Sequence, residues 1–85
     1  MAKVADRQQL TRAVELALAG DWPGAHAIVQ VHEDDPTACW IHAVLHKIEG
    51  DGANSRYWYG RTNQFFEGYA EGMAELRTIQ SVLTY

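Results

Sequence analysis

The chain has 85 residues, a formal net charge of −4 and one cysteine, Cys39. This length is that of a single domain. The lone cysteine excludes an internal disulfide and a CxxC site. The sequence has no basic run, which argues against a nucleic-acid partner. No apolar stretch approaches the ~20 residues of a membrane span, and residues 1–10 lack the apolar core of a signal peptide. We therefore expect a cytoplasmic domain with no membrane partner.

Residues 6–31 are predicted to form a first helical hairpin. Leu10, Val14 and Leu18 recur at helical spacing and form an apolar stripe. Gly20 is expected to end the first helix in the left-handed conformation that glycine adopts readily. Asp21 is expected to cap the next helix, which extends to about residue 31.

Residues 35–61 are predicted to form a second hairpin. Asp35-Pro36 is typical of an N-cap followed by a proline in the first helical turn, and apolar residues continue at helical spacing to about Glu49. Gly50 and Asp51 then repeat the stop and the cap of the first hairpin. The fourth helix is rich in aromatic residues and is expected to end near residue 60.

Residues 64–83 are predicted to form one long amphipathic helix. Its glutamates form a stripe that we expect to face solvent, and Gly68 and Gly72 indicate a close contact with another helix. The expected fold is therefore all-α, with two antiparallel hairpins and a C-terminal helix that caps them or pairs with a second copy. The apolar face consists of Phe65, Tyr69, Met73, Leu76, Ile79 and Leu83, and the glutamate stripe of Glu67, Glu71 and Glu75.

The two hairpins align with each other at an offset of thirty residues. The aligned positions are Ala13-Val14, Gly20-Asp21 and Ala25 in the first hairpin and Ala43-Val44, Gly50-Asp51 and Ser55 in the second. This pattern resembles the tetratricopeptide repeat over residues 10–61, with a repeat shorter than the usual length of about 34 residues. The resemblance implies helical-repeat units that cannot bury their apolar faces alone.

A narrower resemblance covers Trp40 to Arg61, WIHAVLHKIEGDGANSRYWYGR. This segment is similar to part of a small, uncharacterised bacterial protein family. In this chain the element GDWPGAH, at residues 20–26, precedes the segment, and a similar element precedes the corresponding segment in that family. The resemblance is specific, and it implies no activity.

Four histidines are an unusual number for this length, and three of them are candidate metal ligands. His42 and His46 are four residues apart in a predicted helix and project from one face, with Glu49 further along it. The hairpin places His26 nearby. Imidazoles and a carboxylate are the ligands of zinc and similar divalent ions, although the HExxH pattern of metalloproteases is absent. The alternative is a set of histidines hydrogen-bonded within a polar core.

A second candidate site combines arginines with aromatic side chains around the fourth predicted helix. A guanidinium beside aromatic rings can bind a carboxylate or phosphate, or can stack on a ring. The alternative is that the aromatic side chains belong to the core and the arginines extend to solvent. The candidate ligand-binding residues are Trp40, Asn54, Arg56, Tyr57, Trp58 and Arg61.

The sequence carries no evident set of catalytic residues and no glycine-rich phosphate loop. We therefore expect a non-enzymatic protein-interaction or assembly module without a cofactor, whose partner is another protein or a second copy bound through residues 64–83 as a homodimer. The alternative is a metal- or small-ligand-binding protein, enzymatic or not, that uses His26, His42, His46 and Glu49 to bind a divalent metal such as zinc.

Overall fold

The computed structural model describes residues 6–84, and the prediction of an all-α fold is confirmed over this range. Within it, no helix is both long enough and apolar enough to cross a membrane. The elements in chain order are α1 (Arg7–Leu18), α2 (Trp22–Val29), α3 (Pro36–Glu49), α4 (Gly52–Tyr59), the 3-10 helix η1 (Phe66–Gly68) and α5 (Gly72–Thr84).

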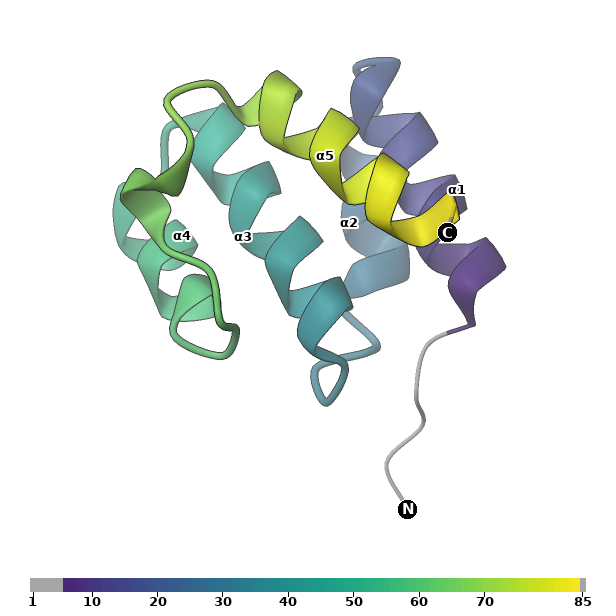
Figure 1. Cartoon of the computed structure of the whole chain (residues 1–85), viewed down its shortest axis with the longest axis horizontal. Coiled ribbons are helices and arrows are strands. Elements are labelled where there is room, and N and C mark those ends of the chain that lie inside the picture. Colours follow the sequence, from purple (N-terminus) through teal and green to yellow (C-terminus); the bar gives the residue numbers. More distant parts are fainter. Residues whose placement is uncertain (1–5, 85) are drawn as a thin grey trace.

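Each helix packs on its neighbours around one apolar core. α1 packs against α2, α2 against α3, and α3 against α4, while α5 lies across α1 and α3 (Figure 1). Helix α3 is central to this arrangement, and nine consecutive residues of it, 38–46, are buried. The apolar side of α5 completes the core, because Leu76, Ile79 and Leu83 are buried there within the same chain.

Two turns share one construction, as their sequences predict. Gly20 and Gly50 have positive φ angles of 87° and 89°, the region in which glycine lacks the steric cost of a side chain. The aspartate that follows each glycine caps the next helix: Asp21 accepts a hydrogen bond from the Gly24 N–H, and Asp51 accepts one from the Asn54 N–H. Each turn therefore ends one helix and starts the next within a few residues.

The prediction of one helix over residues 64–83 is wrong at its start, because α5 begins at Gly72. Residues 64–71 hold only the short helix η1, and tertiary contacts fix this segment. The Lys47 Nζ donates a hydrogen bond to the Tyr69 carbonyl at 3.1 Å, and the Phe66 ring lies near both Lys47 and Arg56. Gly68 also lowers the helix propensity of this segment by about 1 kcal/mol.

The two glycines at positions 68 and 72 differ in their surroundings. A Cβ at Gly72 would lie 2.6 Å from the Ile48 Cγ1, so the start of α5 approaches α3 more closely than a larger residue allows. A Cβ at Gly68 would meet nothing within 4 Å. The predicted close helix contact therefore occurs at Gly72 and is absent at Gly68.

The prediction that the glutamate stripe faces solvent is wrong for Glu75, whose side chain is fully buried. Its carboxylate accepts hydrogen bonds from the Trp40 Nε1 at 2.7 Å and the Lys47 Nζ at 2.8 Å. The Tyr59 hydroxyl donates to the same carboxylate at 2.7–2.8 Å. A buried charge is stable when it is paired and hydrogen-bonded in this way. The network joins α3, α4 and α5, and the periodicity of the final helix contained no sign of it.

Candidate metal centre

Three imidazole side chains converge between helices α2 and α3. His26 comes from α2, and His42 and His46 come from successive turns of α3. One potential ligand atom from each of the three histidines lies within 4.8 Å of the other two. The helical spacing brings His42 and His46 together, and the packing of α2 on α3 adds His26.

Tryptophan rings contact this imidazole cluster, which consists of His26, His42 and His46. The Trp22 indole stacks on His26 with 4.6 Å between the ring centroids, and the Trp58 indole stacks on His42 at 4.0 Å. The Trp22 Nε1 donates a hydrogen bond to the Leu45 carbonyl at 2.7 Å, which fixes the first indole in place. Two indole rings therefore stack on the imidazole cluster.

His42 is the most constrained of the three imidazoles. The residue is 4% exposed, and its Nδ1 is buried without a hydrogen-bond partner within residues 6–84. Burial, together with the neighbouring His26 and His46, lowers the pKa of His42 to about 4. Burial and His46 also lower the pKa of His26. Both rings are therefore neutral near pH 7, and a neutral imidazole has the free lone pair that metal binding requires.

Glu49 contacts the cluster through His46 and is not a member of it. The His46 Nδ1 lies 2.6 Å from the Glu49 Oε2. A carboxylate bonded to one nitrogen of an imidazole fixes the tautomer and leaves the other nitrogen for a metal. Glu49 also belongs to a second group with His46 and Asp51, whose ligand atoms all lie within 4.8 Å of one another. The structure therefore separates the four predicted ligands into three imidazoles and an orienting carboxylate.

The spacing of the cluster is close to that of a tetrahedral zinc site. Zinc–nitrogen bonds of about 2.0–2.1 Å place two tetrahedral ligands about 3.4 Å apart. Ligand atoms no more than 4.8 Å apart can reach this spacing through small side-chain rotations.

The structure does not bring the six arginine and aromatic candidates into one site. Trp58 stacks on the imidazole cluster, and the centre of the Arg61 guanidinium lies 5.7 Å from the centroid of the Trp58 ring. Trp40 lies on the other side of α3 in the Glu75 network. The Asn54 side chain donates to Asp51, and Tyr57 is 56% exposed.

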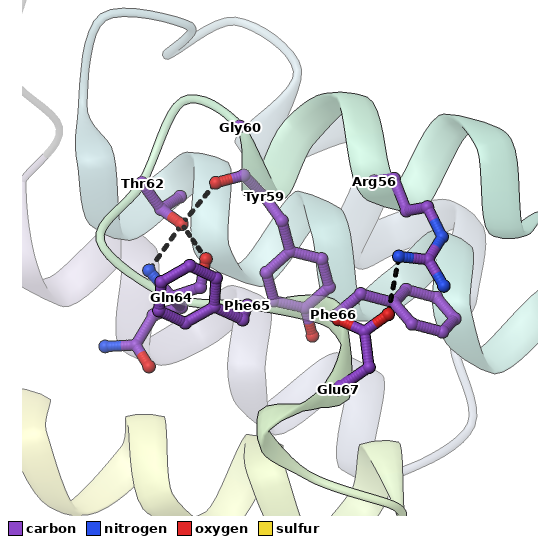
Figure 2. A pocket seen from close by; sticks show the side chains of 8 residues that line it. All are labelled: Arg56, Tyr59, Gly60, Thr62, Gln64, Phe65, Phe66 and Glu67. Atoms are coloured by element: carbon purple, nitrogen blue, oxygen red, sulfur yellow. Dashed lines mark hydrogen bonds and ion pairs between the residues drawn. The ribbon is translucent and has the colours of Figure 1, made fainter.

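Arg56 takes part in a cavity that sequence analysis missed. The cavity has a volume of about 340 Å³ and lies between α4 and the segment before α5 (Figure 2). The Arg56 guanidinium pairs with Glu67 at 2.6 Å and stacks over the Phe66 ring at 4.2 Å. The hydrogen bond from Arg56 lowers the pKa of Glu67. The sequence could not reveal this cavity because one of its walls is residues 64–67, which the sequence predicts to be helical. Its lining residues are Arg56, Tyr59, Gly60, Thr62, Gln64, Phe65, Phe66 and Glu67.

No protein-family model matches this chain, and neither a curated protein nor a solved structure matches it. The arrangement of its own side chains is therefore the basis for assigning a function.

Proposed function

We propose that this protein binds one divalent transition-metal ion, of the zinc class, through the imidazoles of His26, His42 and His46. The observation that supports the proposal is the convergence of three buried or half-buried imidazoles from two helices, with ligand atoms within 4.8 Å of one another. Imidazole nitrogens bind Zn²⁺, Cu²⁺ and Ni²⁺ in preference to Mg²⁺ and Ca²⁺. The class of ion follows from this ligand chemistry.

The unpartnered Nδ1 of His42 supports this proposal over a purely structural role. Buried polar atoms in folded proteins nearly always have a hydrogen-bond partner, and leaving one without a partner costs about 1–3 kcal/mol. In a structural cluster the imidazoles would be expected to hydrogen-bond to each other or to the backbone. The His42 Nδ1 has no such bond within residues 6–84. A metal-binding function gives a reason for keeping an imidazole at the buried position 42.

Three protein nitrogens leave one position of a tetrahedral ion open. An open position is typical of zinc sites that bind water or an external ligand, whereas structural sites have four protein ligands. The Glu49 carboxylate orients His46 from outside the cluster, as carboxylates do behind many metal-bound histidines. We therefore propose a site whose fourth ligand comes from solvent.

The test is a zinc titration of the metal-free protein by calorimetry, with melting temperature as a second measurement. We expect one ion per chain and a stabilisation of about 2.7 kcal/mol when zinc is at a hundredfold excess over Kd. His42→Phe retains a ring next to Trp58 and removes a ligand, so it should abolish both effects. His32→Phe is the matched control, because His32 is also buried with an unpartnered Nδ1 but lies outside the cluster. Absence of zinc binding, or an equal loss in both variants, would overturn the proposal.

The second candidate function is an assembly module, in which tetratricopeptide-like hairpins form a homodimer. An apolar groove of about 250 Å³ favours it. Ile48 and Met73 line this groove and are 43% and 37% exposed, and Met73 belongs to the segment expected to form the dimer contact. A second copy could place apolar side chains there. The full lining is Ala17, Leu18, Ala19, Gly20, Trp22, Leu45, Ile48 and Met73.

Sedimentation tests the assembly function. The wild-type chain should be a dimer at high micromolar concentration, and Ile48→Glu should make it a monomer with an unchanged helical circular-dichroism spectrum. A monomeric wild-type protein at that concentration would exclude the homodimer, and α5 would then serve only its own chain.

A further inference from the structure

An ion pair forms part of the wall of the cavity between α4 and residues 64–67 (Figure 2). The Arg56 Nη1 lies 2.6 Å from the Glu67 Oε2, and the two side chains are 57% and 68% exposed, so a ligand can reach both. A guanidinium has five N–H donors and a carboxylate has about four acceptor sites. The pair therefore keeps unused donors on Arg56 and unused acceptor sites on Glu67.

Contacts with the core hold the Arg56 guanidinium in place. It stacks over the Phe66 ring, 4.2 Å from the centroid, and Phe66 packs edge-on against Tyr59 with 6.1 Å between the ring centroids. Tyr59 is itself buried, and its hydroxyl donates to the Glu75 carboxylate. A preorganised guanidinium binds a carboxylate with a smaller loss of side-chain entropy than a mobile one. Arg56 is therefore an oriented donor at the cavity.

An exposed aromatic ring lines the same cavity. The Phe65 side chain is 73% exposed, and an apolar group placed over it would remove apolar surface from water. The backbone beside Phe65 is held by Thr62, whose hydroxyl donates to the Tyr59 carbonyl at 2.7 Å and accepts from the Gln64 N–H at 2.9 Å (Figure 2). The cavity therefore combines an apolar contact surface with the ion pair.

The charges of the cavity wall favour a ligand that carries both signs. An anion would be attracted by Arg56 and repelled by Glu67. A cation would be repelled by Arg56 and by Lys47, whose Nζ lies 5.1 Å from the Phe66 centroid. In an α-amino acid a single carbon separates the ammonium from the carboxylate. Its two charges are therefore close together, as those of Arg56 and Glu67 are.

We propose that this cavity binds a free α-amino acid with an apolar side chain. The ligand carboxylate binds Arg56, its ammonium binds Glu67, and its side chain covers Phe65. The cavity volume of about 340 Å³ is at the lower end of the range of about 300–1,000 Å³ for ligand sites, which suits a ligand of this size. The cavity shares no residue with the imidazole cluster, so the inference does not depend on metal binding.

The experiment is an NMR titration of the isotope-labelled full chain with L-phenylalanine, in the presence of EDTA so that the amino acid cannot bind through a metal ion. We expect saturable shifts of the amide signals of residues 60–67. Two analogues each lack one charge, because phenylpropionate has no ammonium and phenylethylamine has no carboxylate. Each should bind about fivefold more weakly than L-phenylalanine, which is the upper end of the contribution of an exposed ion pair.

Two variants should remove this preference one charge at a time. Arg56→Gln should no longer distinguish L-phenylalanine from phenylethylamine, and Glu67→Gln should no longer distinguish it from phenylpropionate. Arg12→Gln is the matched control, because Arg12 forms an exposed ion pair with Glu15 outside the cavity. This control should bind all three ligands as the wild type does.

Three results would overturn the inference. The first is the absence of shifts at residues 60–67 with L-phenylalanine at millimolar concentration. The second is an equal affinity of the wild type for the three ligands, which indicates apolar contact alone. The third is an equal loss of binding in Arg12→Gln and Arg56→Gln, which indicates a general charge effect. None of these results bears on zinc binding, because zinc binding is measured in its own titration.

Discussion

The Trp58 indole lies nearly parallel to the His42 imidazole, with 4.0 Å between the ring centroids and 14° between the planes. Trp22 has a similar relationship with His26, at 4.6 Å and 11°. Trp40, in contrast, lies in the Glu75 network. Two of the three tryptophans therefore contact the imidazole cluster, and each is a natural optical probe of it.

Binding of Cu²⁺ at the imidazole cluster should quench tryptophan emission, because a paramagnetic ion would lie next to two stacked indoles. Trp58→Phe and Trp22→Phe should each remove part of the quenching and keep a ring over the imidazole. Trp40→Phe should leave the quenched amount nearly unchanged. Fluorescence titration at pH 7 measures this, and equal losses in all three variants would place the ion elsewhere.

Acid should destabilise the metal-free protein through His42. The pKa of His42 is about 4 in the folded chain against an ordinary value of 6.5, so the unfolded chain takes up the proton first. The stability is at its full value above about pH 6.5 and falls between pH 6.5 and 4, by about 3 kcal/mol from this residue. The lowered pKa of His26 acts in the same direction.

Urea unfolding of the wild type and of His42→Phe at pH 7 and pH 5 measures this contribution. The loss of unfolding free energy between the two pH values should be smaller in His42→Phe, because the variant has no group to protonate at this position. An equal loss in both proteins would assign the acid sensitivity to other groups.

Replacing Glu75 by glutamine should destabilise the fold strongly. The change leaves the buried Lys47 ammonium without its counter-charge and alters the acceptor that Tyr59 and Trp40 use. Breaking a buried ion pair in this way costs about 3–5 kcal/mol. Glu71→Gln, the same change at an exposed position one turn earlier, should alter the unfolding free energy by less than about 0.5 kcal/mol.

Valine at position 50 should cost stability through backbone strain alone. A Cβ at Gly50 meets nothing within 4 Å, yet the φ of 89° is unfavourable for a β-branched residue. The expected loss for Gly50→Val is about 1–2 kcal/mol. Gly52→Val is the control, since that position is equally open and has an ordinary φ. Thermal melts of both variants test the construction of the turn.

Local chemistry explains which features could be predicted from the sequence. The first four helices were predicted within a few residues, because a glycine or an aspartate lies at nearly every boundary and acts on the nearest backbone groups alone. The end of α2, where Gln30 is the C-cap, is the exception. The spacing of His42 and His46 likewise followed from helical geometry. The placement of His26 beside them required only that α2 fold back on α3, and the structure has this arrangement.

Tertiary contacts explain the features that the sequence pattern missed. Phe65 and Tyr69 continue the apolar periodicity of α5, and nothing local prevents a helix there. The helix nevertheless begins at Gly72, because Lys47 bonds to the Tyr69 carbonyl and Phe66 packs near Lys47 and Arg56. These partners come from α3 and α4, so no window of sequence around residue 69 contains them.

The sequence by itself determined the helical class, the two glycine–aspartate turns and the pair of histidines on one face of α3, because each depends on residues within a turn or two of one another. Only the tertiary structure decided that Glu75 is buried and that Glu49 orients His46 from outside the imidazole cluster. The physical reason is that burial of a charge depends on distant donors. Glu75 is stable in the core because Trp40, Tyr59 and Lys47 meet there.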